Sequence, residues 1–186
     1  YYDSDLHLSL RHTAVHGTFP LARCIMTMDD ASWIRSISVL DSPWDTELVV
    51  PPLRAITLTP DVDPSHAEPR MLNVQTPGER FSMDLSTPPR ALLIDLQAAL
   101  TRHDPDLLLT AHGDTWLLPR LLELSRGTNL PLSLNRDTGH PIHRKAARSY
   151  FAYGQVIYRG AQVHLSGRWH IDIYNAVMYH DYGLEG

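Results

Sequence analysis

Apolar residues at helical spacing mark the middle of the chain. The leucines between residues 92 and 100 recur three and four residues apart, which places them on one face of a helix. Thr87-Pro88-Pro89 precedes them, and a capping hydroxyl followed by proline is typical of a helix start. The pattern therefore predicts a helix that begins near residue 88 and ends near His103.

Short apolar runs on either side of this helix predict strands. Residues 71–76 and 80–85 flank Pro77-Gly78, and two such runs around a turn predict an antiparallel hairpin. Residues 106–110 form a short apolar run of the kind that is buried in the centre of a sheet. The elements expected after this run are a turn over 112–115 and a helix over 116–125, closed by Gly127.

The two ends of the chain carry weaker patterns. Short strands are expected over 7–10, 22–26, 32–40, 48–50, 53–59, 150–158, 163–165 and 168–173, with a last helix over 174–180. A helix, a buried strand, a turn and a second helix form a unit with partly parallel strand pairing. Together, these expected elements predict an α/β or α+β domain over residues 51–186, with three layers and a mixed sheet flanked by helices. A β-rich segment over 1–50 precedes it.

Composition narrows the class of protein. A length of 186 residues, with 43% hydrophobic and 20% charged residues, excludes a disordered, collagen-like or disulfide-rich chain. A net charge of −5 argues against a strongly basic nucleic-acid module. No run approaches the roughly 18 apolar residues of a membrane span, so no membrane partner is expected. A single cysteine, Cys24, and the lack of a secretory signal predict a cytoplasmic protein, and both ends have the character of cuts through a longer one.

Candidate chemistry gathers at the end of the predicted buried strand. His112 and Asp114 follow this strand, and α/β proteins bind ligands where such strands end. Asp114 has two interpretations, because it could hold a proton or cation, or it could cap the helix that follows. The 11 histidines show no spacing of a recognisable metal site, although His170 and Asp172 would share one strand face.

Two segments combine basic and aromatic residues. Arg168-Trp169 and the aromatic residues of 150–153 suit base stacking, although ordinary cross-strand packing explains the same pattern. The sequence contains no G-x-S-x-G nucleophile elbow, no Walker loop and no dinucleotide-binding glycine pattern. Composition and short motifs therefore assign no reaction by themselves.

Residues 104–121 resemble a motif of a known family. The stretch DPDLLLTAHGDTWLLPRL resembles the second exonuclease motif of family B DNA polymerases, where a buried strand is followed by N-G-D-x-F-D-x-P-x-L. Residues 52–58, 121–137 and 167–172 resemble other segments of that exonuclease region in the same order. The resemblance covers about residues 50–186, and the second motif is its most specific part.

This resemblance implies a ribonuclease H-like 3′→5′ exonuclease domain. Its reaction is phosphodiester hydrolysis by two divalent cations, which four carboxylates hold. In the first motif, the resemblance places Thr59 at an aspartate position and Asp61 at a glutamate position. A shift of two residues would offer Asp61 and Asp63 instead.

In the second motif, the resemblance places different residue types at the site positions. His112 stands at the family's asparagine, Trp116 at its aromatic residue and Leu117 at its catalytic aspartate. Asp114 matches an aspartate that is not catalytic. A leucine side chain offers no oxygen to a cation, and Mg²⁺ requires oxygen ligands.

With Thr59 and Leu117 in place of carboxylates, the sequence predicts a degenerate exonuclease-like domain of a family B-type DNA polymerase, catalytically inactive and without a cofactor. The expected partners are DNA, in weak contact, and the other domains of a parent polymerase. The residues expected to contact DNA are Asp114, Trp116, Arg168 and Trp169.

Two alternatives stay open at this point. The first is a divergent metal-dependent 3′→5′ exonuclease with magnesium or manganese on Asp61, Asp63 and Asp114. The second is a protein–protein interaction domain with no role in nucleic-acid chemistry. Binding of a divalent cation at the strand end would favour the first alternative.

Overall fold

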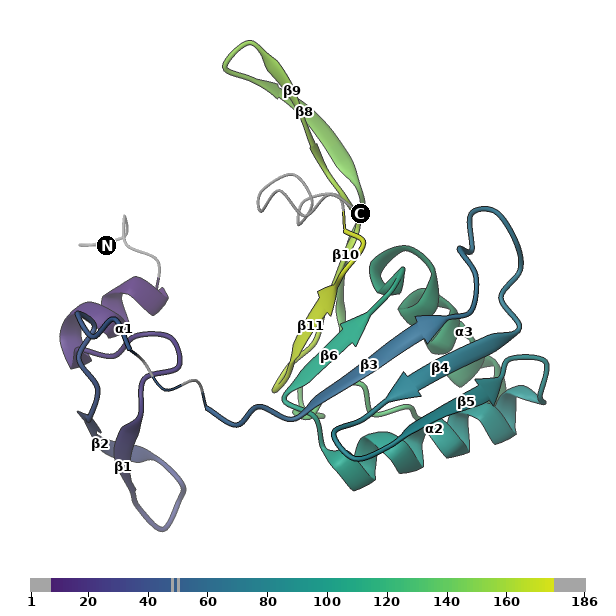
Figure 1. Cartoon of the computed structure of the whole chain (residues 1–186). Helices are drawn as coiled ribbons and strands as arrows, with labels where there is room; N and C mark the ends of the chain where they lie inside the picture. Colours follow the sequence, from purple (N-terminus) through teal and green to yellow (C-terminus); the bar gives the residue numbers. More distant parts are fainter. Residues whose placement is uncertain (1–7, 48, 50, 176–186) are drawn as a thin grey trace. The chain divides into compact units, whose positions relative to one another are not determined.

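The computed structural model describes residues 8–47, 49 and 51–175, and the chain divides into two units (Figure 1). The first unit is Tyr1–Pro52 and the second is Leu53–Gly186. The second unit contains the large sheet and the candidate site. No helix in the described ranges is long and apolar enough to cross a membrane.

The first unit combines one helix with a hairpin. Its elements are helix α1 (Leu8–His16) and the antiparallel strands β1 (Cys24–Met28) and β2 (Ile34–Val39). The hairpin confirms the strands expected over 22–26 and 32–40. The strand expected over 7–10 is wrong, because the chain is helical from Leu8 and contains no glycine or proline until Gly17. Gly17 ends the helix in the left-handed conformation, with φ at 66°.

The second unit is built on a five-stranded sheet in the order β11-β6-β3-β4-β5 (Figure 1). Its strands are β3 (Ala55–Pro60), β4 (Met71–Gln75), β5 (Arg80–Asp84), β6 (Leu107–Thr110) and β11 (Trp169–Asp172). Strands β3, β6 and β11 are parallel to one another, whereas β4 is antiparallel to β3 and to β5. The hairpin expected around Pro77-Gly78 and the strand expected over 106–110 are confirmed.

Two helices cover one face of this sheet. Helix α2 spans Pro89–His103 and helix α3 spans Leu118–Thr128. They pack on alternate residues of β3, β4 and β6, in a core that includes Leu58, Leu72, Leu96, Leu108 and Leu121. The expected α+β class, a mixed sheet flanked by helices, is confirmed. No helix within residues 53–175 covers the other face of the sheet.

Two smaller sheets follow α3. Strand β7 (His143–Lys145) pairs with β10 (Gln162–His164), and β8 (Arg148–Ala152) pairs with β9 (Gln155–Arg159). The single strand expected over 150–158 is wrong, because the chain reverses at Tyr153 and Gly154. Both residues have positive φ angles, 51° and 78°, which is the backbone conformation of a tight two-residue hairpin turn.

Some helix ends differ from the sequence-based expectation. Pro88 rather than Thr87 is the N-cap of α2, and no side chain caps this helix. Helix α3 continues through Gly127, because Asn129 ends it in the left-handed conformation, which asparagine tolerates better than most residues. Outside the described residues lie most of the helix expected over 174–180 and of the strand expected over 48–50.

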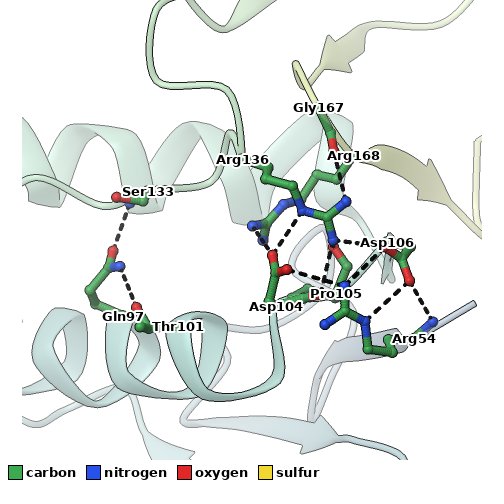
Figure 2. A network of polar contacts seen from close by, with 10 residues as sticks. All are labelled: Arg54, Gln97, Thr101, Asp104, Pro105, Asp106, Ser133, Arg136, Gly167 and Arg168. Carbon is green, nitrogen blue, oxygen red and sulfur yellow. Dashed lines mark hydrogen bonds and ion pairs between the residues drawn. The ribbon is translucent and has the colours of Figure 1, made fainter. Parts of the chain in front are cut away.

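An Arg–Asp cluster joins the starts of the three parallel strands (Figure 2). Arg54 directly precedes β3, and Asp104 and Asp106 lie between α2 and β6. Arg136 comes from the segment after α3, and Arg168 directly precedes β11. The cluster therefore connects four segments that are distant in sequence.

Arg136 is the centre of this cluster. Its Nε donates to Asp104 Oδ1 at 2.8 Å and its Nη2 donates to Asp106 Oδ1 at 2.8 Å. The same guanidinium donates to the carbonyl oxygens of Pro105 at 2.9 Å and Gly167 at 3.1 Å. A planar guanidinium presents five donors in a fixed arrangement, so one side chain can hold several chain segments in position.

Arg54 completes the cluster from the side of β3. Its backbone N–H donates to Asp106 Oδ2 at 2.9 Å, and its guanidinium also donates to Asp106. These bonds from Arg54, with those from Arg136, hold the pKa of the Asp106 carboxyl well below its usual range. The carboxylate therefore stays charged at neutral pH, and the attraction between the segments persists.

Arg168 has a different environment in the same cluster. The residue is 8% exposed, its Nη2 lies 3.6 Å from Asp104 Oδ1, and burial lowers the pKa of its guanidinium. Its Nε and Nη1 are buried, and within the described chain they have no hydrogen-bond partner. Buried donors without partners are costly, so Arg168 adds less to stability than Arg136 does.

Asp106→Asn should lower the free energy of unfolding by about 2 kcal/mol at neutral pH, because it replaces charge-assisted hydrogen bonds by neutral ones. A carboxyl whose pKa is depressed by folding stabilises the native state above its unfolded pKa of about 3.9 and loses that contribution as the pH falls. The difference between the wild-type chain and Asp106→Asn should therefore be constant above pH about 5 and shrink below about 4.

Urea unfolding followed by circular dichroism across this pH range measures the effect. Glu123→Gln is the matched control, because Glu123 is exposed on α3 and should change stability by less than about 0.5 kcal/mol. A difference between the wild-type chain and Asp106→Asn that does not depend on pH would contradict the assigned role of Asp106.

Candidate functional site

The candidate site lies where strands β3, β6 and β11 end. These parallel strands finish side by side, with Leu58 opposite Thr110 and Asp172 opposite Thr110 on the other side. After β6, His112 adopts the left-handed conformation with φ at 56° and leads into a π-helical turn, η1 (Gly113–Leu117). Loops that follow such strands converge, so side chains from distant segments meet here.

The first-motif positions lie on β3 and just after it. Thr59 is half-buried on the sheet face away from the helices, opposite Asn73 of β4. Asp61 is exposed, and its carboxylate accepts a hydrogen bond from the backbone N–H of Arg70 at 3.0 Å. Asp61 therefore holds the connection between β3 and β4 in shape.

Asp63 and His112 are brought together by the fold. The Asp63 carboxylate accepts hydrogen bonds from the Ser65 hydroxyl at 2.6 Å and from the Ser65 backbone N–H at 2.8 Å. These bonds lower the pKa of Asp63 to about 2. His112 Nε2 lies 3.8 Å from Asp63 Oδ1, and the His112 ring stacks on Tyr174 with centroids 4.9 Å apart.

Asp114 is buried rather than open to a ligand. Only 7% of the residue is exposed, and its carboxylate accepts hydrogen bonds from the Val163 backbone N–H at 2.6 Å and from Asn175 Nδ2 at 2.7 Å. Burial raises the pKa of this carboxyl, while the two hydrogen bonds oppose the shift. Asp114 thus ties the turn η1 to β10 and to the chain that follows β11.

Asp172 supplies a side-chain acceptor at the start of η1. Its carboxylate accepts a hydrogen bond from the Asp114 backbone N–H at 2.9 Å, at the start of η1, and another from the Tyr174 N–H at 3.0 Å. No side chain of η1 itself caps the turn. The helix-capping interpretation of Asp114 is therefore wrong, because the Trp116 and Leu117 N–H groups donate to the His112 carbonyl while the Asp114 carboxylate is bound elsewhere.

A compact contact explains the glycine of the second motif. Thr110 Oγ1 and His170 Nε2 form a hydrogen bond of 2.8 Å directly beneath Gly113. A Cβ atom on Gly113 would lie 1.8 Å from Thr110 Oγ1 and 2.7 Å from His170 Nε2. His170 also bonds the Val163 carbonyl through Nδ1 at 2.8 Å, so the ring is fixed at both nitrogens.

Leu117 points into the core. Its exposure is 1%, and it belongs to the same apolar cluster as Leu118 and Leu121, with Trp116 packed against that cluster. The Leu117 backbone N–H donates to the His112 carbonyl at 2.8 Å, which is the five-residue spacing of a π-helix. The position that resembles a catalytic aspartate therefore contributes to packing.

The residues expected to contact DNA are distributed unevenly over the structure. Asp114 and Arg168 are buried and engaged as described above, Trp116 is half-buried, and 52% of Trp169 is exposed. Nor do the described residues contain any group of three or more His, Cys, Asp or Glu side chains arranged to hold a metal ion.

A basic segment spans strands β7 to β9, and the sequence pattern pointed only to its aromatic residues at 150–153. Residues 143–159 contain four Arg or Lys residues and no Asp or Glu, in a chain whose net charge is −5. Phe151, Tyr153 and Tyr158 are 73%, 103% and 56% exposed on the β8–β9 hairpin. A count of charged residues in short windows of the sequence reveals this basic segment. Its division into two strands depends on the turn at Tyr153, which such a count does not show.

Gly113→Ala should destabilise the chain by about 3 kcal/mol, because the added methyl group meets the Thr110–His170 hydrogen bond in a packed region. Gly127→Ala is the control, since nothing lies within 4 Å of a Cβ at that helical position. It should raise stability by up to about 1 kcal/mol. Thermal and urea unfolding of both variants measure the difference, and equal stability of the two would contradict the close contact.

Similarity of this chain to known proteins is found in the fold. A scan against protein-family models and a search of curated proteins found no match. Among solved structures, the chain is similar to the family B DNA polymerase of the hyperthermophilic archaeon Pyrobaculum calidifontis, with a TM-score of 0.60 and 19% sequence identity. The match covers 93% of this chain and 22% of the polymerase chain. The fold of this chain is therefore related to that of part of a family B DNA polymerase.

Proposed function

We propose that this chain is an exonuclease-like domain of a family B-type DNA polymerase that has lost the nuclease reaction. In this proposal it acts as a scaffold for the other domains of a parent polymerase and contributes a weak DNA contact. It holds no metal or other cofactor. The fold likeness and the resemblance of residues 104–121 support the relationship to polymerases.

The environment of Leu117 carries the proposed loss of activity. Hydrolysis with two cations depends on carboxylates that face the metal ions, because oxygen ligands neutralise the cations and fix their geometry. Leu117 stands at one such position in the resemblance, and its side chain is 1% exposed within the core. Thr59, at a second such position, carries a neutral hydroxyl on β3.

The surroundings of the remaining carboxylates agree with this proposal. Asp61 and Asp63 accept hydrogen bonds from neighbouring loop residues, and Asp114 is buried against Val163 and Asn175. Each carboxylate therefore stabilises a connection or a packing contact. These structural roles explain why carboxylates persist at the strand ends in a domain without the reaction.

The purified chain should not shorten labelled single-stranded DNA in the presence of Mg²⁺ or Mn²⁺. Gel analysis of 3′-labelled and 5′-labelled DNA over time measures the reaction, with Asp61→Ala as the comparison. Metal-dependent shortening by the wild-type chain that is lost in Asp61→Ala would refute the proposal and favour the divergent-nuclease alternative.

The segment His143–Arg159 supports the proposed DNA contact. Its charged groups are all basic, and its exposed aromatic rings lie next to them on the same hairpin, with the Arg148 guanidinium 5.9 Å from the Tyr150 ring centroid. Basic side chains attract the phosphate backbone, and exposed aromatic rings stack on unpaired bases. Of the residues expected from the sequence, Trp169 is exposed, but it lies at the start of β11 beside Asp106, so the proposed contact rests on the hairpin residues.

Phe151→Ala should weaken binding of single-stranded DNA by roughly tenfold, because one base–aromatic stack contributes about 1–3 kcal/mol. Fluorescence anisotropy with a labelled oligothymidine at several salt concentrations measures the affinity, which should fall as salt rises. Trp44→Ala is the control, since Trp44 is 89% exposed but belongs to the first unit. An equal loss of DNA affinity in both variants, or an affinity that does not depend on salt, would contradict a DNA contact on this hairpin.

A further inference from the structure

A groove lies between strand β5, at the edge of the sheet, and helix α2. Its volume is about 590 Å³. Its apolar lining comes from Phe81 and Met83 of β5 and from Leu92 and Ala99 of α2. Ala98 and Ala99 are small, so α2 leaves space beside β5 where these two residues line the groove. None of these residues belongs to the candidate site at the ends of the parallel strands.

The backbone of β5 is available along this groove. Thr76 N donates to Glu79 O at 2.9 Å, and Leu85 N donates to Arg70 O at 2.7 Å. These two bonds, at either end of the hairpin, fix which residue pairs of β4 and β5 are hydrogen-bonded. Because bonding alternates along an antiparallel strand, the N–H and C=O groups of Arg80 and Ser82 point away from β4. Within the described ranges, no strand pairs with this edge of β5.

Ser82 shows that the groove reaches this free edge. Its hydroxyl donates to Asn73 Oδ1 at 2.7 Å on the sheet face opposite the helices, yet Ser82 also lines the groove. Its backbone is therefore the part that faces the groove. A chain placed along β5 could form backbone hydrogen bonds with Ser82 and Arg80, and its alternate side chains would lie over the apolar lining.

The charges of the groove are unbalanced at one end. Glu79 faces both basic side chains of the lining, with its Oε1 3.3 Å from His103 Nε2 and 3.6 Å from Arg102 Nη1. Asp95 also lines the groove, and it has no ion-pair partner among the residues that the structure describes. The Asp84 side chain lies on the same sheet face as that of Ser82, opposite the helices, so it adds no charge to the groove.

We propose that the groove between β5 and α2 binds an extended segment of a partner protein, which adds to β5 as a further strand. Alternate residues of this segment are apolar and lie over Phe81, Met83 and Ala99. A lysine or arginine of the segment lies beside Asp95. Strand addition of this kind takes affinity from backbone hydrogen bonds and specificity from the alternate side chains.

This inference goes beyond the proposed function, because the groove uses neither the strand-end carboxylates nor the basic hairpin. The observations favour a basic segment over an acidic one, since the unpaired carboxylate of Asp95 would repel negative charge. They also favour an extended segment over a helix, because the free N–H and C=O groups of β5 match only an extended backbone.

Titration of the whole isotope-labelled chain with short capped peptides tests this assignment. The probes are Lys-Thr-Val-Thr-Val and its reverse, Val-Thr-Val-Thr-Lys, so that both strand directions are covered. The matched probes replace Lys by Glu, or the central Val by Pro, which lacks an N–H. Saturable amide shifts of Arg80 and Ser82 with one lysine peptide are expected, with much weaker binding of the glutamate and proline versions.

Two variants test the groove itself. Ala98 is exposed on α2, so Ala98→Arg should fold and should abolish binding by filling the groove. Asp95→Asn should weaken binding of the lysine peptide by roughly threefold to fivefold, as expected for an exposed ion pair. Ile94→Lys is the control, because Ile94 is 51% exposed on α2 outside the groove and changes the charge by the same amount as Asp95→Asn.

The outcomes separate this inference from its rivals. Equal binding of the lysine and glutamate peptides, unchanged binding to Ala98→Arg, or shifts that do not include Arg80 and Ser82 would each overturn it. Sedimentation that shows a dimer held by β5 would also overturn it, because a second copy would then occupy the edge. None of these results depends on DNA binding or nuclease activity, so failure here is distinct from failure of the proposed function.

Discussion

The bonds of Arg136 to the segment between α2 and β6 are the interaction on which the second unit depends most. Parallel strands are joined by long connections, so nothing local aligns their starts. Here Arg136 and Arg54 bind the carboxylates of Asp104 and Asp106, and Asp106 also accepts the Trp169 N–H through its backbone carbonyl. The starts of β3, β6 and β11 are thereby fixed in register, and their opposite ends meet at the candidate site.

At those opposite ends, polar groups stabilise the structure instead of presenting ligands. Asp172 accepts the Asp114 N–H in the first turn of η1, and the Asp114 carboxylate holds β10 and Asn175. Leu117 completes the apolar core under the same turn. A site of this kind keeps the arrangement of the strand ends, while its carboxylates are committed to hydrogen bonds within the chain. The proposed loss of the nuclease reaction follows from this use of the residues.

The distribution of charge divides the surface of the second unit into regions of different character. The chain has a net charge of −5, yet residues 143–159 carry only basic charges. By contrast, Asp95 leaves negative charge along the groove beside β5. The basic hairpin suits phosphate groups, whereas the groove suits a basic peptide, so the two proposed contacts would not compete for the same partner.

The sequence by itself determined the local elements whose signals are short-range. The leucine spacing of α2, the hairpin around Pro77-Gly78 and the apolar run of β6 were predicted because periodicity and turn residues act within a few positions. Only the tertiary structure decided that Asp172 rather than Asp114 caps η1, that Arg168 is buried, and that the backbone edge of β5 faces a groove. These properties depend on how separate elements of the fold pack against one another, which no local pattern encodes.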